Sequence, residues 1–239
     1  CGRSGREYLV ANSRWNHGCS KKMKRTLTKT ADGSYTLYVP ELDEHYHSIH
    51  GALQEANHVF IQNGLAMLSN KKSIRVLEMG LGTALNAYLT YEWAKKNHIE
   101  VWYCGVEAYP VDGEVITTCL KEIGVDKQDV LSFFSSLSYE EPLAMDLFTL
   151  VPVHAFWADL SMEDSVDIIF YDAFGPRAQE EMWTLGNFEI AFKALKSDGI
   201  LVTYCAKGQV KRDLKSVGFK VESRPGPPGK REMTVAFKS

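Results

Sequence analysis

The chain has 239 residues, of which 45% are hydrophobic and 24% charged, and its formal net charge is −3. That length is enough for one generous domain or two small ones, each with a buried core. No apolar run is long enough to cross a bilayer, and the acidic balance argues against a general nucleic-acid binder. Composition therefore predicts a globular protein and excludes a membrane-spanning one.

The charge is unevenly distributed along the chain. Residues 207–239 hold nine basic residues and three acidic ones, whereas residues 23–206 carry a net charge of −13. A local basic end can dock a phosphate backbone even on an acidic protein, although a solvated basic face explains the same pattern.

The first 22 residues show neither the apolar core of a signal peptide nor hydrophobic periodicity. Met23 follows them directly. We therefore expect residues 1–22 to be either disordered or foreign to a native protein that starts at Met23, and residues 23–239 to form a single domain.

The five cysteines include no C-x-x-C pair. Cys104 and Cys205 lie in apolar, strand-like runs and are interpreted as small buried side chains. This usage suits a reduced compartment, so a cytoplasmic protein is expected.

From residue 35 onward, strand-like apolar runs alternate with stretches of helical period. This alternation predicts a doubly wound, mostly parallel α/β sheet that ends in an antiparallel strand pair. The expected strands are 35–39, 74–79, 101–106, 155–157, 166–171, 199–205, 219–223 and 233–237. The expected helices are 50–68, 84–96, 183–195 and 209–217, with a mainly helical elaboration over 112–150.

A glycine turn follows the first buried strand and opens a helix. Gly80 and Gly82 are present, but Leu85 stands at the third glycine position of a dinucleotide fingerprint. Glu78, two positions before the first glycine, would repel a pyrophosphate but can pair with the cationic amino-acid end of S-adenosylmethionine. The turn therefore favours S-adenosylmethionine, and an ordinary tight strand–helix turn is the alternative.

Two further acids follow expected strands. Glu107 is placed to accept hydrogen bonds from both ribose hydroxyls of the cofactor. Asp159 is placed to contact the adenine amino group. Either acid can instead cap a helix, which for Asp159 alone is the preferred interpretation.

Asp172 ends the strand expected at 166–171, and we expect Phe174 and Pro176 beside it to shape an acceptor pocket. Methyl transfer from a sulfonium is an in-line displacement, in which the enzyme mainly positions the nucleophile and removes water. The unperturbed pKa of aspartate, about 3.9, makes it a poor base for an alkylamine, so we expect Asp172 to orient the amine. A strand-end aspartate that only makes a turn is the alternative.

Four histidines, at 45, 47, 50 and 58, gather in a pattern that can hold zinc. No cysteine or clear fourth ligand accompanies them. We therefore interpret them as surface histidines and expect no metal site.

Several motifs resemble one family, the methyltransferase half of the bifunctional tRNA 5-methylaminomethyl-2-thiouridine biosynthesis enzyme, MnmC, and its stand-alone form, MnmD. The resemblance extends from about residue 37 to the C-terminus. It rests on Asp172-Ala-Phe-Gly-Pro176, Glu181-Met-Trp-Thr184, Thr203-Tyr204, Val210-Lys-Arg-Asp-Leu214, Gly218-Phe219 and Lys230-Arg-Glu-Met233.

The resemblance implies a class I, Rossmann-like methyltransferase that uses S-adenosyl-L-methionine and acts on tRNA. The implied reaction is N-methylation of the aminomethyl group on a wobble uridine, from 5-aminomethyl-2-thiouridine to 5-methylaminomethyl-2-thiouridine. The cofactor would be bound by Glu78, Gly80, Gly82, Glu107 and Asp159. Asp172 would serve the acceptor amine. Lys230 and Arg231, at the basic end, are expected to carry the tRNA.

The sequence departs from the family at Leu81, where an aromatic residue is usual, and at Ala84, where a glycine is usual. Residues 177–181 also differ, which puts the details of the acceptor loop in doubt. The flavin-dependent half has no counterpart, so a separate oxidoreductase is expected to act on the same base. An aminopropyltransferase of the spermidine synthase kind and a non-catalytic tRNA-binding module remain as alternatives.

Overall fold

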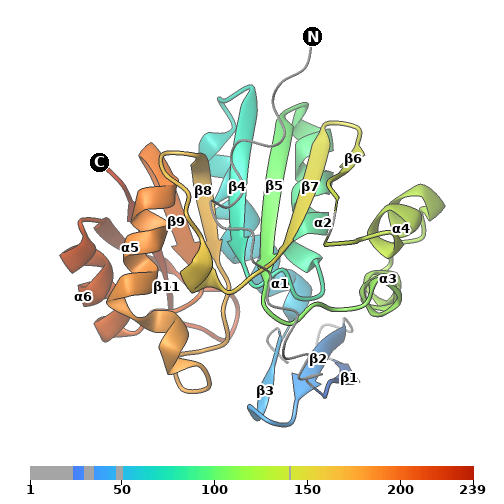
Figure 1. Cartoon of the computed structure of the whole chain (residues 1–239), viewed down its shortest axis with the longest axis horizontal. Coiled ribbons are helices and arrows are strands. Elements are labelled where there is room, and N and C mark those ends of the chain that lie inside the picture. The colour runs from blue at the N-terminus through green and yellow to red at the C-terminus, as the bar shows by residue number, and fades with distance from the viewer. Residues whose placement is uncertain (1–23, 30–34, 47–50, 140) are drawn as a thin grey trace.

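The computed structural model describes residues 24–29, 35–46, 51–139 and 141–239, so the expectation for residues 1–22 lies outside it. The described chain forms one large sheet with helices on both faces and a small antiparallel sheet beside it (Figure 1). No helix in these ranges is both long and apolar enough to span a membrane.

The large sheet has eight strands in the order β10–β11–β9–β8–β4–β5–β7–β6. Its five central strands, from β9 to β7, run parallel, whereas β11 is antiparallel to both of its neighbours, as expected for the end of the chain. The strands are β4 (Ser73–Met79), β5 (Glu100–Glu107), β6 (Leu143–Met145), β7 (Phe148–His154), β8 (Val166–Tyr171), β9 (Leu195–Thr203), β10 (Lys220–Pro225) and β11 (Glu232–Phe237).

Helices cover both faces, because apolar side chains of the strands point alternately to two cores. On β4, Ile74 and Val76 join the core that includes α2, whereas Leu77 and Met79 join the core that includes α5. The helices are α1 (Ala52–Ala56), α2 (Leu85–Asn97), α3 (Gly113–Glu122), α4 (Gln128–Ser135), α5 (Leu185–Ala194) and α6 (Gly208–Val217). The doubly wound α/β prediction is confirmed.

The small sheet contains β1 (Thr26–Lys29), β2 (Tyr35–Val39) and β3 (Glu44–His45). In Figure 1 it lies below the large sheet, near α1. The expected strand at 35–39 is its middle strand.

The prediction for the third central strand was wrong. Residues 155–157 lie in a turn, and the strand is β7, which ends at His154. Pro152 interrupts the strand pattern in the sequence. The neighbouring β6 pairs only as far as Leu150, so Pro152 lies where β7 has no partner on its outer side, a position that tolerates proline. The segment 112–150, which was expected to be mainly helical, forms α3 and α4 and then β6 and the start of β7.

The helix expected at 50–68 is also broken into pieces. After α1, the chain continues as a π-helical segment at Asn57–Gln62 and a 3-10 turn at Leu65–Leu68. Gly64 separates these two because a side chain there would lie 2.3 Å from the carbonyl oxygen of Phe60.

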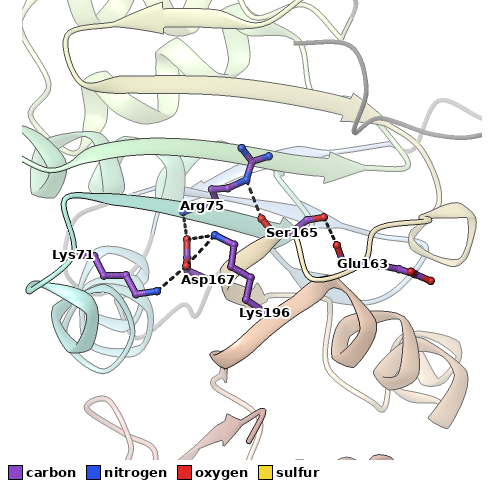
Figure 2. A network of polar contacts seen from close by, with 6 residues as sticks. All are labelled: Lys71, Arg75, Glu163, Ser165, Asp167 and Lys196. Atoms are coloured by element: carbon purple, nitrogen blue, oxygen red, sulfur yellow. Dashed lines mark hydrogen bonds and ion pairs between the residues drawn. The ribbon is translucent and has the colours of Figure 1, made fainter. Parts of the chain in front are cut away.

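A polar network braces the large sheet where β4 and β8 begin (Figure 2). Asp167 accepts hydrogen bonds from Lys71 at 2.7 Å, from the Arg75 amide at 2.7 Å and from Lys196 at 3.2 Å. Burial alone would raise the pKa of Asp167, but these three donors outweigh it and lower the pKa. Asp167 is therefore an ionised, fully partnered anchor among elements that are distant in sequence.

Replacing Asp167 with alanine should lower the free energy of unfolding by about 2–3 kcal/mol at pH 7, because two ammonium groups and one amide lose their acceptor. Since the folded-state pKa is lowered, this contribution is present at neutral pH and disappears only below pH ~4. Lys71→Ala removes a partly exposed member of the network and should cost less than about 1 kcal/mol. Urea unfolding measures both, and equal losses would contradict a central role for Asp167.

Candidate active site

Asp172 and the glycine turn lie together because they follow two neighbouring parallel strands. In the β4–β8 ladder, Met79 is paired with Tyr171, so the residues that follow leave the sheet at the same edge. The Asp172 amide donates to the Met79 carbonyl at 3.3 Å. This is the carboxyl edge, where open α/β sheets bind their ligands.

The turn itself requires its two glycines. Gly80 has a φ of 86° and Gly82 a φ of 50°, both in the left-handed region. A Cβ atom on Gly80 would lie 3.0 Å from the Asp172 carbonyl oxygen, and one on Gly82 would lie 2.8 Å from the Tyr46 ring. The glycines therefore allow the turn to approach both Asp172 and Tyr46.

Ala84, where the family usually has glycine, is also left-handed, with a φ of 57°. It stands just before α2. Alanine in this conformation costs roughly 1–2 kcal/mol in strain, which a glycine would avoid.

Asn86, in the first turn of α2, links the two acids that the sequence assigns to different ligands. Its Nδ2 donates to Glu78 Oε1 and to Asp172 Oδ2, each at 2.8 Å. Asn86 is not among the site residues expected from the sequence. The available signal was a polar side chain between Leu85 and Ala87, which are both buried.

Glu78 lies beneath the turn and is only 1% exposed. Its Oε2 atom has no hydrogen-bond partner among the described residues. Burial, followed by the negative charge of Asp172, raises the pKa of Glu78 well above its ordinary value. The Tyr103 hydroxyl and the Asn86 amide oppose this shift, and a ligand cation beside the carboxyl group would oppose it further.

Glu107, at the end of β5, is tied to the same turn. Its carboxylate accepts from the Gly82 amide at 2.9 Å and from the Tyr109 amide at 2.8 Å. Burial raises its pKa, although these two amides oppose the shift. Each carboxylate oxygen still has a lone pair for a ligand hydroxyl.

The small sheet closes this region from the other side. The Arg25 guanidinium donates to the Tyr46 hydroxyl at 2.9 Å, to the Pro110 carbonyl at 3.1 Å and to the Tyr109 carbonyl. Tyr46 also packs edge-to-face against Phe174, with ring centroids 5.0 Å apart. No motif in residues 24–46 pointed to this role.

A pocket of about 330 Å³ opens beside Asp172, within the size range of small-molecule sites. Burial raises the pKa of Asp172 to about 7; the negative charge of Glu55 acts in the same direction, while Asn86 and Lys230 oppose it. The lining residues are Glu44, His45, Tyr46, Glu55, Asp172, Ala173, Phe174, Gly175, Tyr204 and Lys230.

Lys230 reaches into this pocket from the turn between β10 and β11. Its ammonium lies 2.9 Å from Glu55 Oε1 and 2.8 Å from Oε2, and 4.2 Å from the centre of the Tyr204 ring. Tyr204 is fixed in turn by a hydrogen bond of 2.8 Å from its hydroxyl to the Ala173 carbonyl. Lys230 is thus part of the pocket wall and already paired.

The structure therefore brings Asp172, Phe174 and Lys230 to one pocket, with Glu78, Gly80, Gly82 and Glu107 grouped behind it. The other three expected site residues, Asp159, Pro176 and Arg231, do not line the pocket. Asp159 and Arg231 are exposed, and Pro176 is partly buried.

His47 and His50 lie outside the described residues, so the zinc-like pattern is only partly visible. His58 interacts with the Pro225 carbonyl at 2.9 Å. Among the residues that the structure describes, no group of three histidine, cysteine or acidic side chains is arranged to hold a metal.

Comparison with known proteins agrees with this geometry. Residues 142–239 match the model of an S-adenosyl-L-methionine-dependent methyltransferase family. The bifunctional tRNA 5-methylaminomethyl-2-thiouridine biosynthesis protein MnmC of Cupriavidus metallidurans is 28% identical over 218 residues, covering 84% of this chain and 32% of that protein. MnmC of Leptospira interrogans is 29% identical over 210 residues, covering 82% and 32%. The chain thus spans about a third of the length of these curated relatives.

Solved structures share the fold. MnmC2 from Aquifex aeolicus has a TM-score of 0.74 at 23% identity, with 90% of this chain and 71% of that one covered. Spermidine synthase from Thermotoga maritima has a TM-score of 0.55 at 17% identity, with 93% and 71% covered. Together with the matches above, these findings show that the chain is similar to S-adenosyl-L-methionine-dependent methyltransferases and to part of the bifunctional protein MnmC.

Proposed function

We propose that this enzyme N-methylates the aminomethyl group of a modified wobble uridine in tRNA, converting 5-aminomethyl-2-thiouridine to 5-methylaminomethyl-2-thiouridine. The observation that carries the proposal is the pocket in which Asp172, with a pKa of about 7, adjoins the glycine turn. The names of the MnmC relatives support the choice of tRNA and of this base.

The residues around the turn fit S-adenosyl-L-methionine. The free Oε2 atom of Glu78 suits the cofactor's ammonium group, and Glu107 can accept from its ribose hydroxyls while it holds the Gly82 amide. Asp159, exposed just after β7, is assigned to the adenine amino group. When bound, the cofactor supplies a methyl group that its sulfonium makes electrophilic.

Asp172 would prepare the acceptor nitrogen. An alkylammonium with a pKa near 10.4 must lose a proton before its lone pair can attack. The sequence suggested only an orienting role, because an ordinary aspartate has a pKa of about 3.9. Burial raises the pKa of Asp172 to about 7, which makes it a much better match for that proton. We therefore assign Asp172 as both the orienting group and the proton acceptor.

The pocket wall would surround the uracil ring. Phe174 and Tyr46 offer aromatic edges and faces next to Asp172, and Pro176 supports the acceptor loop. Glu55 is already paired with Lys230, so Asp172 is the carboxylate left to receive the amine. These features support an amine acceptor.

The basic C-terminal end would dock the tRNA backbone. Strand β10 runs parallel to β9, so the turn that follows it returns from the ligand edge. Because Lys230 is paired with Glu55 in the pocket, we assign phosphate contact to the exposed Arg231 and assign Lys230 to the acceptor base.

Changing Arg231 and Lys230 singly to alanine should give different defects. Arg231→Ala should weaken tRNA binding and reduce the salt slope by roughly one unit. Lys230→Ala should leave the slope nearly unchanged but raise KM, since Glu55 would lose its partner within the pocket. Filter binding across a salt series, with steady-state kinetics, measures both effects. Identical salt slopes for Arg231→Ala and the wild type would contradict phosphate docking there.

The alternative function, that of an aminopropyltransferase, is supported by the similarity between this chain and spermidine synthase. That similarity concerns the fold alone. The two activities separate in one assay with parallel donors. Methyl-labelled S-adenosyl-L-methionine with tRNA that lacks the modification should give labelled RNA. An aminopropyl donor with putrescine should give no product. Transfer only to putrescine would overturn the proposal, and no transfer to either would favour a binding module.

We further propose that an oxidoreductase acts on the same base before methylation, because the MnmC relatives are named as bifunctional. We propose that this activity is that of a flavin-dependent oxidoreductase.

A further inference from the structure

Asn86 occupies an unusual position between two carboxyl groups. It is 2% exposed and lies at the start of α2, between the ends of β4 and β8. Its Nδ2 atom carries two hydrogens and contacts two acceptors, one oxygen of Glu78 and one of Asp172. Both donors of the amide are therefore used.

The opposite orientation of this amide is strongly disfavoured. Rotating it by half a turn would place Oδ1 against two carboxyl oxygens and break both of these hydrogen bonds. In the present orientation, only Oδ1 lacks a partner among the described residues. The two acids thus fix the rotamer of Asn86, and Asn86 in return fixes one oxygen of each acid.

We propose that Asn86 is a positioning residue for methyl transfer, whose amide holds Oδ2 of Asp172 and thereby leaves Oδ1 as the oxygen available to the acceptor amine. The proposal rests on the function assigned to Asp172 above. It adds that the acid assigned to the cofactor and the acid assigned to the acceptor share one hydrogen-bond donor.

The surrounding charges explain why such a donor is needed. Glu55 on α1 repels the ionised form of Asp172, and Lys230, from the β10–β11 turn, attracts it. The acidic groups Glu78, Tyr103 and Tyr204 also interact with Asp172. The remaining titratable residues that line the pocket are Glu44, His45 and Tyr46. Burial and Glu55 disfavour a negative charge on Asp172, and the Asn86 amide and Lys230 are the groups that favour it.

Removing the amide should therefore shift the titration of Asp172. A hydrogen bond to a charged group is lost in Asn86→Leu, and the midpoint should rise by about one pH unit. Asn86→Asp preserves the shape but replaces the donor with a third acid, and should raise the midpoint at least as far. Thr90→Val is the matched control, because Thr90 is fully buried on the same helix and its hydroxyl has no partner among the described residues.

The test is carbon-13 NMR of the aspartate side-chain carboxyls across pH, with the free full chain. The Asp172 signal is assigned by its absence from Asp172→Asn. We expect a wild-type midpoint near 7, higher midpoints in both Asn86 variants and no change in Thr90→Val. Midpoints in both Asn86 variants within about 0.3 unit of the wild type would overturn the proposal. If Asn86→Leu does not fold, the isosteric Asn86→Asp decides the question.

A second readout links the titration to the reaction. The acid limb of the methyl-transfer rate should move with the NMR midpoint, and kcat should fall more than KM rises, because binding contacts remain. A merely structural loss would lower the rate equally at every pH. Since the NMR titration needs no substrate, a shifted midpoint without any tRNA methylation would refute the proposed function and leave the role of Asn86 intact.

Discussion

Asp172→Asn should lower kcat for methyl transfer by roughly 100- to 1,000-fold, the effect of removing one preorganised electrostatic group. Asparagine matches aspartate in shape, so the fold should survive. Its carbonyl oxygen would accept the hydrogen bond from Asn86, which turns its NH₂ group towards the pocket. A donor would then face the acceptor amine and misdirect the lone pair. The amide would also be unable to accept the proton that the alkylammonium must lose before its nitrogen can attack.

Binding of S-adenosyl-L-methionine to this variant should remain nearly normal, because Glu78 and Glu107 are unchanged. Single-turnover rates with labelled cofactor measure kcat, and calorimetry measures affinity. A near-normal kcat would remove Asp172 from the chemistry. A variant that no longer binds the cofactor would mean that the carboxylates are assigned to the wrong ligands.

The pH dependence of the methyl-transfer rate tests whether Asp172 must be ionised for the reaction. Asp172 must be ionised to accept a proton, so the wild-type rate should fall as the pH drops through about 7. In Asp172→Asn, the small remaining rate should lose this acid limb.

Glu107→Gln should weaken binding of S-adenosyl-L-methionine by roughly 100-fold, corresponding to about 2.7 kcal/mol for lost charged hydrogen bonds. The carboxylate now accepts from two backbone amides at once. In glutamine, one of these positions would hold an NH₂ group that faces another donor. The variant therefore loses its ribose contact and also disturbs the turn at Gly82.

Asp159→Asn serves as the comparison for Glu107. Asp159 is exposed, and among the described residues its side chain forms no hydrogen bond that holds the turn, so its loss should weaken binding about ten-fold or less. Calorimetric titration measures both variants. If Glu107→Gln binds as tightly as the wild type, Glu107 is a structural brace and not a cofactor ligand.

The fold followed largely from the sequence, because its central strands are nearly continuous apolar runs. The run before Asp172 matches β8 residue for residue, and the run before Gly80 differs from β4 by one residue. Pairing between these strands then places Asp172 beside the turn without any further information. The prediction failed at β7 because Pro152 masks the strand pattern. Proline is tolerated there because β6 does not extend that far, and a local sequence pattern does not show where a neighbouring strand stops.

The residues at the site that were predicted lie at strand ends, in the loops that directly follow them, or in the basic C-terminal segment. Asn86, Glu55 and Tyr46 come from segments whose pattern is unremarkable, and they reach the site through tertiary packing. Lys230 was expected to meet a phosphate because it lies in a basic segment. Its ion pair with Glu55, 175 residues away in sequence, could not be foreseen from charge counts. The raised pKa of Asp172 likewise depends on burial that no linear motif encodes.

The most direct test of the central claim is mass spectrometry of nucleosides from tRNA that carries 5-aminomethyl-2-thiouridine, incubated with the enzyme and S-adenosyl-L-methionine. We expect this nucleoside to disappear and 5-methylaminomethyl-2-thiouridine to replace it, with no conversion by Asp172→Asn on the same timescale. Persistence of the unmethylated nucleoside, or a methyl group on any other atom of the tRNA, would contradict it.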